Sequence, residues 1–507
     1  MGGSSNKHAH NASAEADQLR KGEHHSVIDN PGRIHEFYDI AKSRLGEGSF
    51  AAVFQACNKS TGFERAVKVM SKNRRCNLPK FYNEIAILKS VDHPNIVKYY
   101  ESFQDNKFVY IIMECCNGAE FADWLAENNH MTEPQAAVTM QQVFRAITYM
   151  HKVGVMHRDL KPENFMFDTE DEIEDNTVKV VDFGLATRFS IHPVTNEADI
   201  ITNKCGAPYY VAPQVLAGHY NYMADVWSIG VLMYILLCGY PPFYGDSDAD
   251  ILAKVRLGNY SFNQADWKNI SKEAKDVIRG LLKINPADRM TTAQALQSPW
   301  MKLFAPRSEE LPLKNSLVFH LKNFSQANRL KRAALFVIAG NLTDEELKNS
   351  IESFNNMDVE GDGMLGYEEI TNGLKRAGVK DIPKELAQIL CDMDSDGSGQ
   401  VEFTEFLAAT IDRKYLTEDN VWSAFRVFDQ NGDGKISQTE MYRVLNTRSG
   451  EGEEAVNPQD VVALMRELSE DKDKFVDFPE FYNMMRGGGP GTKKKHKKME
   501  EHEETET

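Results

Sequence analysis

Two kinds of hydrophobic pattern follow one another along the first part of the chain. Short apolar runs such as AVKVM (66–70) and FVYIIME (108–114) have the length and residue types of β-strands. Longer segments such as PQAAVTMQQVFRAITYMHKVG (134–154) and DVWSIGVLMYILLCG (225–239) have the length and pattern of helices. This order predicts a small sheet-rich lobe followed by a mostly helical lobe.

The pattern changes twice more toward the end of the chain. The segment LKNFSQANRLKRAALFVI (321–338) is apolar on one side and basic on the other, which predicts an amphipathic helix. From residue 341 an acidic unit recurs at spacings of 35 to 40 residues. We expect a multidomain α+β protein with these parts: a disordered N-terminal arm (1–37), a two-lobed domain (38–301), a linker with the amphipathic helix (302–340), an all-α repeat domain (341–486) and a disordered charged tail (487–507).

Net charge distinguishes the repeat domain from the rest. At 507 residues the chain is too long for one core, and its 42% hydrophobic content is ordinary for globular domains. The net charge is −17, and residues 341–486 alone carry about −17. An acidic balance argues against nucleic acid as a partner. It also indicates that the repeat domain needs carboxylates for another purpose.

The cysteines and the N-terminus bear on the cell compartment. Seven scattered cysteines without a C-x-x-C pattern indicate a reduced, cytoplasmic protein, and neither a membrane span nor a signal-peptide core is evident. Gly2 satisfies the first requirement of N-myristoylation, but Asn6 stands where Ser or Thr is preferred. We therefore favour a flexible arm, and we expect membrane contact only if Gly2 is myristoylated.

Two motifs near the N-terminus have the residue types that bind phosphate. Glycines in LGEGSFAAVF (45–54) let backbone N–H groups approach phosphate oxygens, although such a segment alone is equally typical of an ordinary hairpin. Next come Lys68 on a predicted strand and Glu84 on a predicted helix. By themselves they would form a surface ion pair.

Two further motifs point to phosphoryl transfer. HRDLKPEN (157–164) offers the loop carboxylate of Asp159, followed by Lys161 and the amide of Asn164. VVDFGLA (180–186) offers Asp182 on a tight turn, which suits a ligand of Mg²⁺. Phosphoryl transfer requires positioning, charge neutralisation and an orienting base, and these side chains supply all three.

Together these motifs resemble a eukaryotic protein kinase domain, over residues 38–301. The resemblance implies ATP and Mg²⁺ as cofactors, Asp159 as catalytic base, and Lys161 and Lys68 on the phosphates. HRDLKPEN is typical of serine/threonine kinases. Glu120 and Glu163 match positions that accept a substrate arginine, so we expect protein substrates with upstream basic residues. The implied nucleotide-site residues are Gly46, Gly48, Val53, Lys68, Glu84, the gatekeeper Met113, Glu114 and Cys116 on the hinge, Glu120, and the Mg²⁺ ligands Asn164 and Asp182.

Three positions depart from the kinase pattern. Ala51 replaces the third glycine of the loop, which costs little. Gln214 replaces the glutamate expected to pair with Arg289, so a neutral hydrogen bond would stand in for a buried ion pair. Ala207 stands where a threonine hydroxyl would link the catalytic aspartate and lysine. These changes predict a slower kinase that retains its metal and base residues.

Arg158, beside the catalytic aspartate, is the residue that usually binds an activation-loop phosphate. The loop here contains Glu197 and Asp199, with Thr195 and Thr202 nearby. Two hypotheses stay open, namely a carboxylate that substitutes for phosphate and phosphorylation of a threonine.

The acidic repeats have the ligand spacing of EF-hand calcium loops. DQNGDGKISQTE (429–440) matches throughout, and DSDGSGQVEFTE (394–405) matches as well. DVEGDGMLGYEE (358–369) matches through Asp358, Asp362, Gly363 and Glu369, but its Glu360 at position 3 is bulkier than usual, which leaves the calcium affinity of this loop open. The predicted Ca²⁺ ligands are Asp358, Glu360, Asp362, Met364 and Glu369 in the first loop, Asp394, Asp396, Ser398, Gln400 and Glu405 in the second, and Asp429, Asn431, Asp433, Lys435 and Glu440 in the third.

The fourth loop, SEDKDKFVDFPE (469–480), departs from the motif. Ser469 occupies position 1 and Lys474 replaces the turn glycine, so we expect a weak or empty site. Val476 can still pair with Ile436 in the short strand that joins two loops. The weaker predicted ligands are Asp471, Asp473 and Glu480.

The order of kinase domain, basic helix and four EF-hands resembles the calcium-dependent protein kinases of plants and protists. RLKRAALFVIAGNLTDEE (329–346) resembles the junction of that family. The resemblance implies that this junction inhibits the kinase until Ca²⁺ opens the EF-hand lobes, which then bind it as an intramolecular partner. Its predicted apolar anchors are Leu317, Leu321, Phe324, Leu330, Ala334 and Ile338.

Three alternatives stay open at this point. The junction helix could pack on the kinase lobe with its basic side chains in water. The chain could be a calcium-sensing scaffold with weak or no kinase activity, as Ala207 and Gln214 would suggest. It could also be an ordinary kinase whose basic helix recruits a separate calmodulin, although the built-in EF-hands make that redundant.

Overall fold

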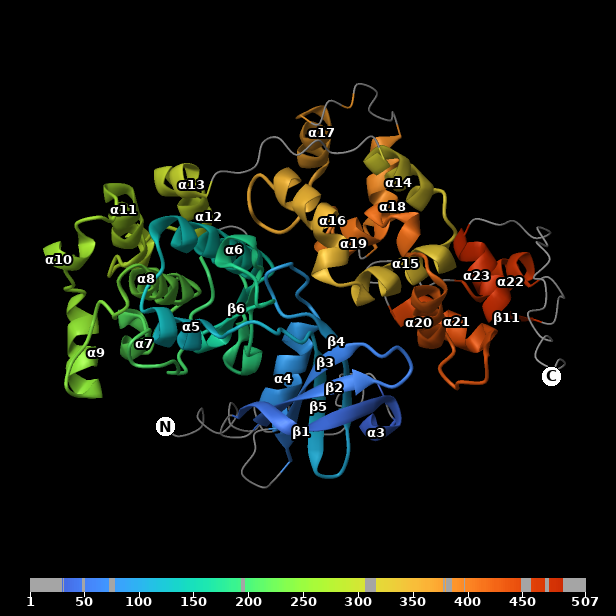
Figure 1. Ribbon diagram of the computed structural model, residues 1–507, viewed down its shortest axis with the longest axis horizontal. Helices are drawn as coiled ribbons and strands as arrows, with labels where there is room; N and C mark the ends of the chain where they lie inside the picture. The colour runs from blue at the N-terminus through green and yellow to red at the C-terminus, as the bar shows by residue number, and fades with distance from the viewer. Residues whose placement is uncertain are drawn as a thin grey trace, which may run out of the picture. The chain divides into compact units, whose positions relative to one another are not determined.

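The computed structural model divides the chain into two compact units (Figure 1). One unit spans Met1–Pro312 and Ile351–Gly378, and the other spans Leu313–Ser350 and Val379–Thr507. The first unit thus contains the two-lobed domain together with the first acidic loop. Within the described residues, no helix is long and apolar enough to cross a membrane. The described residues are 30, 32–47, 51–72, 78–192, 197–305, 316–376, 379, 385–395, 397–447, 457–469 and 474–486.

An antiparallel five-stranded sheet, in the order β1-β2-β3-β5-β4, forms the first lobe. The apolar runs 66–70 and 108–114 lie in β3 and β5, as predicted. Helix α4 buries Phe81 and Ile85 in the same apolar cluster as Met70 of β3 and Ile111 of β5. The elements are β1 (Tyr38–Glu47), β2 (Ala51–Asn58), β3 (Glu64–Ser71), α4 (Leu78–Leu88), β4 (Tyr99–Gln104) and β5 (Phe108–Met113).

The disordered arm was predicted to extend to residue 37, which is several residues too far. Residues 34–37 form the short helix α3 (Ile34–Phe37), and Ile34 is buried in a cluster with Tyr38 and Phe103. The side chain of Asn30 also donates to Glu101 of β4 at 3.2 Å. A single buried isoleucine thus anchors the end of a segment whose composition is otherwise polar. Residues 1–29 and the tail 487–507 lie outside the described residues.

The second lobe is mostly helical, as predicted. The side chain of Thr132 accepts a hydrogen bond from the backbone of Gln135 and so caps α6, while every residue of α8 is buried, which explains its continuous apolar sequence. The helices are α5 (Phe121–Asn128), α6 (Glu133–Lys152), α7 (Pro213–Ala217), α8 (Met223–Cys238), α9 (Asp248–Leu257), α10 (Gln264–Trp267), α11 (Lys272–Leu281), α12 (Thr292–Leu296) and α13 (Pro299–Phe304). Short strand pairs join β6 (Val155–Met156) to β9 (Thr187–Arg188) and β7 (Phe165–Phe167) to β8 (Val178–Val180).

The acidic repeats fold as pairs of helices around loops, which confirms an all-α character apart from one short strand pair. Ile436 pairs with Val476 between β10 and β11, as the sequence predicted. The elements are α16 (Asp344–Met357), α17 (Tyr367–Arg376), α18 (Leu386–Met393), α19 (Phe403–Thr410), α20 (Glu418–Phe428), β10 (Lys435–Ser437), α21 (Gln438–Thr447), α22 (Pro458–Leu468), β11 (Phe475–Asp477) and α23 (Phe478–Arg486).

The amphipathic segment 321–338 is not one helix. It is divided between α14 (Ser316–Ser325) and α15 (Arg329–Asn341), with a break of three residues. The side chain of Asn328 accepts a hydrogen bond from the backbone N–H of Lys331 at 2.8 Å and begins the second helix. The single predicted helix is therefore corrected to a helix pair, because an asparagine cap competes with helix continuation.

Candidate active site and calcium loops

Lys68 lies between two carboxylates at the centre of the candidate active site. Strand β3 places its Nζ 2.5 Å from Oε1 of Glu84 on α4 and 2.6 Å from Oδ1 of Asp182. Burial acts to lower the pKa of Lys68, but Glu84 and Asp182 outweigh it and raise the pKa. Burial likewise acts to raise the pKa of Asp182, and the ammonium of Lys68 lowers it to about 2. Lys68 and Asp182 are thus both charged at neutral pH.

Asp182 occupies the tight turn that the sequence predicted. Its φ angle is 59°, in the left-handed region, and its carboxylate accepts a hydrogen bond from the N–H of Gly184 at 3.3 Å. The side chain of Asp182 is 50% exposed, so an ion can reach it. Strain at this position is common in sites where a side chain must be aimed at a ligand.

The loop 157–164 brings Asp159, Lys161 and Asn164 together. Nζ of Lys161 lies 3.2 Å from Oδ2 of Asp159, and Nδ2 of Asn164 donates to the backbone carbonyl of Asp159 at 2.6 Å. The N–H of Val181 donates to the carbonyl of Asn164 at 2.9 Å, which holds this loop beside the residue that precedes Asp182. The amide oxygen of Asn164 and the carboxylate of Asp182 are donors of the kind that Mg²⁺ prefers, so these residues fit the ion.

Asp225 holds the backbone of the loop 157–164 in place, a role that the sequence did not reveal. Its two carboxylate oxygens accept hydrogen bonds from the backbone N–H groups of His157 and Arg158, both at 2.8 Å. Asp225 is 1% exposed, and Arg158 has a φ angle of 70°. The available signal was a lone acid at the start of a helix that is otherwise almost wholly apolar, because a buried carboxylate requires donors.

The residues predicted for the nucleotide site line the sheet and the segment that follows β5. Gly46 pairs with Val53 across the β1–β2 hairpin, while Gly48 lies outside the described residues. Met113 ends β5, where it pairs with Ala66 of β3. Val53 in turn pairs with Lys68 of β3, and Lys68 pairs with Ile111 of β5.

Glu114 and Cys116 follow Met113, and neither offers a charged side chain to a nucleotide. The carboxylate of Glu114 pairs with Nζ of Lys179 at 2.9 Å and accepts from the N–H of Lys98 at 3.1 Å. Burial raises the pKa of the Cys116 thiol well above its usual value, so the thiol is neutral. The contribution expected from both residues is therefore their backbone.

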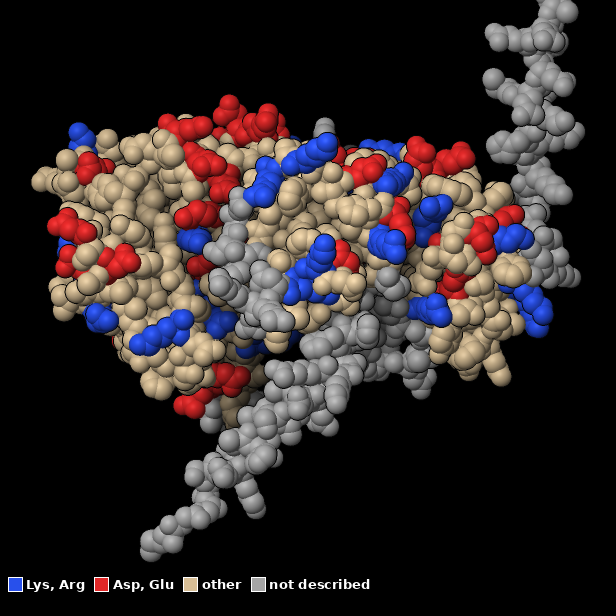
Figure 2. Space-filling model, turned by 90° about the horizontal axis from the view of Figure 1, so that it is seen from below, with Lys and Arg blue, Asp and Glu red and all other residues tan. Residues whose placement is uncertain are grey.

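Glu120 and Glu163 are near enough to interact electrostatically. Glu120 precedes α5, and its pKa is raised by burial and then by the carboxylates of Asp123 and Glu163. A cation placed among these acids would relieve their repulsion. Figure 2 shows acidic and basic side chains interspersed over the described residues of one face.

Gln214 keeps one contact with Arg289, as predicted. Its Oε1 accepts from a guanidinium NH₂ at 3.2 Å, and Arg289 donates further to the carbonyls of Lys283 and Met223. The amide nitrogen of Gln214 is buried without a hydrogen-bond partner in the described structure. Burial lowers the pKa of Arg289 to about 9. The arginine is therefore solvated by carbonyls instead of a carboxylate.

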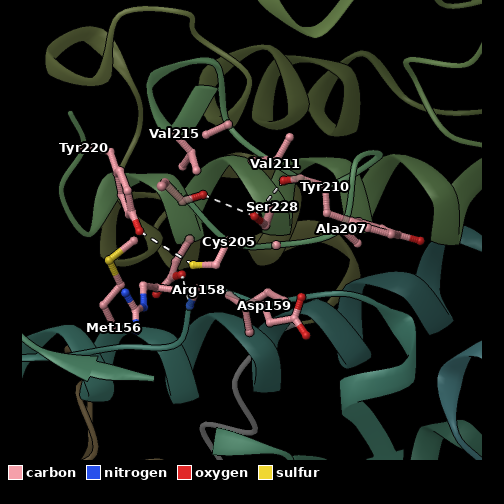
Figure 3. A pocket seen from close by; sticks show the side chains of 15 residues that line it. Met156, Arg158, Asp159, Cys205, Ala207, Tyr210, Val211, Val215, Tyr220 and Ser228 are labelled. Atoms are coloured by element: carbon pink, nitrogen blue, oxygen red, sulfur yellow. Dashed lines mark hydrogen bonds between the residues drawn. The ribbon is translucent and has the colours of Figure 1, made fainter. Parts of the chain in front are cut away.

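Ala207 lines the same pocket as Asp159 and Arg158 (Figure 3). Its methyl group has no polar atom to offer to Asp159, which Nζ of Lys161 approaches at 3.2 Å. On the other side of this pocket, the hydroxyl of Tyr220 lies 3.7 Å from Sγ of Cys205.

Among the described residues, no hydrogen bond or ion pair joins Arg158 to a carboxylate of the activation loop, so the hypothesis that a carboxylate replaces the phosphate stays a prediction. Nε of Arg158 donates to the carbonyl of Leu185 at 2.6 Å. The carboxylate of Asp199 accepts from the N–H of Ser190 at 2.8 Å, and Glu197 is exposed. Thr195 lies outside the described residues.

The third calcium loop has the backbone of an EF-hand. Gly432 and Gly434 have φ angles of 73° and 84°, which only glycine adopts readily, and their N–H groups donate to the two oxygens of Asp429 at 2.8 and 2.9 Å. Glu440, at position 12, accepts from the N–H of Ser437 at 2.9 Å. The ligands at positions 3, 5 and 7 of this loop, all exposed, are Asn431, Asp433 and Lys435.

The second loop repeats this arrangement. Asp394 accepts from the N–H groups of Ser398 and Gly399 at 2.9 and 2.8 Å, and Glu405 accepts from the N–H of Ser395 at 2.6 Å. The hydroxyl of Ser398 donates to the carbonyl of Gln400, the predicted position-7 ligand. Asp396 lies outside the described residues. The oxygen donors in these loops fit Ca²⁺, although no three acidic, histidine or cysteine side chains converge on a metal position in the described part of the chain.

The fourth loop is strained where the sequence departs from the motif. Lys474 adopts a φ angle of 70°, a conformation that costs a non-glycine residue roughly 1–2 kcal/mol. Glu480 accepts from the N–H of Asp477 at 3.0 Å, as position 12 does in the other loops. Asp471 and Asp473 lie outside the described residues. The expectation of a weak site stays a prediction, and the strain at Lys474 supports it.

The first loop carries the same motif but a different environment. Asp358 accepts from the N–H groups of Gly361 and Gly363 at 2.7 and 3.0 Å, and Glu369 accepts from the N–H of Val359 at 3.0 Å. Asp362 and Met364 are buried, while Glu360 is exposed. This loop lies in the first compact unit.

Comparison with known proteins identifies the families to which both halves of the chain belong. Residues 40–301 match the protein kinase domain family, and residues 340–411 and 419–486 match the family of EF-hand domain pairs. The chain is 38% identical over 466 residues to calcium-dependent protein kinase 3 of Plasmodium berghei (strain Anka), covering 91% of this chain and 82% of the relative. It is 40% identical to calcium-dependent protein kinase 3 of Plasmodium yoelii yoelii, covering 82% and 76%. Calcium-dependent protein kinase 5 of Plasmodium falciparum (isolate 3D7) is 35% identical, with 91% and 80% covered.

Proposed function

The chain belongs to the calcium-dependent protein kinases, and on this basis we propose how its residues transfer phosphate and how calcium controls them. It is a calcium-activated serine/threonine protein kinase that uses ATP and Mg²⁺, acts on protein substrates and is regulated within its own chain.

The geometry around Lys68 supports the catalytic roles that we propose. When bound, Mg²⁺-ATP supplies the γ-phosphoryl group and neutralises part of its charge. Lys68, held by Glu84, would orient the α- and β-phosphates, and Asn164 and Asp182 would hold the metal. Asp159 accepts the proton of the substrate hydroxyl, and Lys161 stabilises charge on the transferred group. Most of these groups already contact one another, so little reorganisation remains for substrate binding.

One observation supports calcium control of the active site: the apolar anchors of the junction are buried among the EF-hand helices. Leu321, Phe324 and Leu330 are at most 2% exposed, and α14 and α15 pack against α18, α19 and α20. Arg332 pairs with Asp392 at 3.6 Å. We propose that calcium stabilises this packing of α14 and α15 against the EF-hand helices, and that the junction inhibits the kinase when the packing is lost.

The energy required is within the reach of the calcium loops. Shifting a switch from 1:99 to 99:1 requires about 5.5 kcal/mol of differential binding. Two or three sensor-type loops can supply this free energy together, because the coupling between one binding site and a conformational switch is typically about 1–3 kcal/mol.

The test is phosphate transfer from ATP to an Arg-x-x-Ser peptide, with calcium and with chelator. Transfer is expected only with calcium, and Asp182→Ala should abolish it. Leu330→Glu should abolish the calcium response, because it disrupts the packing of the junction against the EF-hand helices. Phe319→Glu, at an exposed position of α14, is the matched control. Equal transfer with calcium and with chelator would refute inhibition by the junction.

The same assay tests the substrate preference and the alternative function. Glu120→Ala and Glu163→Ala should each raise KM for an Arg-x-x-Ser peptide but not for an Ala-x-x-Ser peptide. A calcium-sensing scaffold would show a calcium-induced shape change without transfer. The formed Lys68–Glu84 pair argues against that reading.

For the cell compartment we propose the cytoplasm, with membrane contact only after myristoylation of Gly2. The scattered cysteines support a reducing compartment. Labelling with a myristate analogue, with Gly2→Ala as control, decides the second point.

A further inference from the structure

The first calcium loop is buried where the matching loops are exposed. Each residue from 361 to 364 is buried. In the third loop the counterparts Gly432, Asp433, Gly434 and Lys435 are all exposed. The three loops share one motif, so the difference comes from what covers the first loop and not from the ligand spacing.

The helical lobe of the kinase domain provides this cover. Nζ of Lys152, at the end of α6, lies 2.5 Å from Oδ2 of Asp362. Met364 is 8% exposed and belongs to the main apolar cluster of the kinase domain. Gln297 also donates to the carbonyl of Val359 at 3.4 Å. One ion pair, one buried side chain and one backbone contact therefore attach the loop to this lobe.

The loop backbone fits closely against the lobe at two glycines. A Cβ at Gly361 would lie 2.7 Å from Cδ1 of Leu296, and one at Gly363 would lie 2.6 Å from Cδ2 of His93. Both glycines also have positive φ angles, of 71° and 75°. The EF-hand motif thus supplies the smooth surface that this close approach requires.

The ion pair uses the oxygen that a calcium ion would need. Oδ1 of Asp362, at position 5 of the loop, accepts a hydrogen bond from the N–H of Met364 at 3.1 Å and so shapes the loop. Oδ2 is the oxygen left for a cation, and the ammonium of Lys152 is bound to it. The lysine thus supplies positive charge where the EF-hand motif calls for a metal ion.

We propose that the first calcium loop has two competing partners, Ca²⁺ and the helical lobe of the kinase domain, and that Lys152 is the competitor of calcium. By linkage, docking lowers the calcium affinity of the loop by the same factor by which calcium weakens docking. The second and third loops then fill first, and the first loop responds at higher calcium. This inference deepens the proposed calcium control and rests on it only in taking the first loop as a calcium site.

Calcium binding to the full-length chain tests the competition. Glu405→Gln, Glu440→Gln and Glu480→Gln together remove the position-12 ligands of the other loops and leave the first loop intact. In this background Lys152→Met should tighten calcium binding about tenfold in titration calorimetry. Lys302→Met, at an exposed position of α13, is the matched control and should leave the affinity unchanged.

Hydrogen exchange gives a second readout that does not depend on activity. Amides of residues 359–366 should exchange faster in calcium than in chelator in the parent chain. Met364→Lys, which copies position 7 of the third loop and keeps the backbone ligand, should exchange fast in both conditions.

Equal calcium affinity for Lys152→Met and Lys302→Met would overturn the proposal, as would a first loop that binds no calcium in either variant. Neither result would touch the proposed kinase control, which the peptide assay on the unmodified chain tests separately. Conversely, a chain without calcium-stimulated transfer but with tighter binding in Lys152→Met would refute the control and support the competition.

Discussion

Restoring a carboxylate at position 214 should stabilise the kinase domain. Arg289 is 3% exposed, and the amide nitrogen of Gln214 is buried without a hydrogen-bond partner in the described structure. A buried unsatisfied donor costs about 1–3 kcal/mol, and Gln214→Glu removes it. The substitution also converts the 3.2 Å contact into a charge-assisted bond, roughly twice as strong. Desolvation of the new carboxylate offsets part of this gain. A net stabilisation of about 2 kcal/mol is expected.

Thermal unfolding of the full chain in chelator measures this effect. A stabilisation of about 2 kcal/mol raises Tm by roughly 4–8 °C for a domain of this size. The transition of the kinase domain is recognised because a nucleotide analogue shifts it. Gln214→Met is the control: it removes the unsatisfied donor, which gains about 1–3 kcal/mol, and the acceptor of Arg289, which costs a similar amount, so it should leave Tm nearly unchanged.

The pH dependence of this stabilisation provides a further check. Burial lowers the pKa of Arg289 to about 9 from 12.5, so the native state disfavours its charge and gains stability as the pH rises from 9 toward 12.5. A carboxylate partner favours the charged form. The advantage of Gln214→Glu should therefore be complete between about pH 6 and 9 and should decline above pH 9. An unchanged or lower Tm throughout pH 6–9 would show that desolvation outweighs the ion pair, and the reasoning would fail.

Four more substitutions test other parts of the structure. Lys68→Met should lower kcat by roughly a hundredfold or more in the peptide assay, because it removes the cation that orients the phosphates; a smaller loss would contradict that role. Ala207→Thr should raise kcat about fivefold, the effect of one added hydrogen bond near Asp159, and no increase would mean that Lys161 needs no such link. Lys474→Gly should relieve about 1 kcal/mol of backbone strain and tighten calcium binding to the fourth loop in calorimetry; unchanged binding would locate the defect elsewhere in that loop. Lys68 depresses the pKa of Asp182 to about 2 from 3.8, so its carboxylate stabilises the fold above pH 3.8 and this stability is lost as the pH falls toward 2; Asp182→Asn should flatten that part of an acid-unfolding curve, and an unaltered curve would contradict the pairing.

Local chemistry in the sequence was sufficient to predict the catalytic residues and the calcium loops. Lys68, Asp159 and Asp182 lie in short motifs whose function depends on residue type and spacing over a few positions. The calcium loops are also local, because one loop of 12 residues provides the whole ligand set. The pairing of Ile436 with Val476 followed from the same motif, since paired loops share a short strand.

Features that depend on contacts between distant segments were missed. Asp225 supports the catalytic loop from almost 70 residues away, and nothing beside it in the sequence reveals its partners. The break between α14 and α15 was also missed, because the apolar pattern continues through an asparagine whose capping role is weak in sequence.

The sequence by itself determined the family, the order of the domains and the cofactors, and it predicted the ligating and catalytic residues, because these depend on residue type and local spacing. Only the tertiary structure decided that the first calcium loop packs on the kinase lobe through Lys152 and Met364, while loops of the same motif stay exposed. It also decided that Arg289 is surrounded by carbonyls and the amide of Gln214. The physical reason is that burial and charge pairing depend on which distant surfaces meet, and the pattern of a single segment carries no record of its partner.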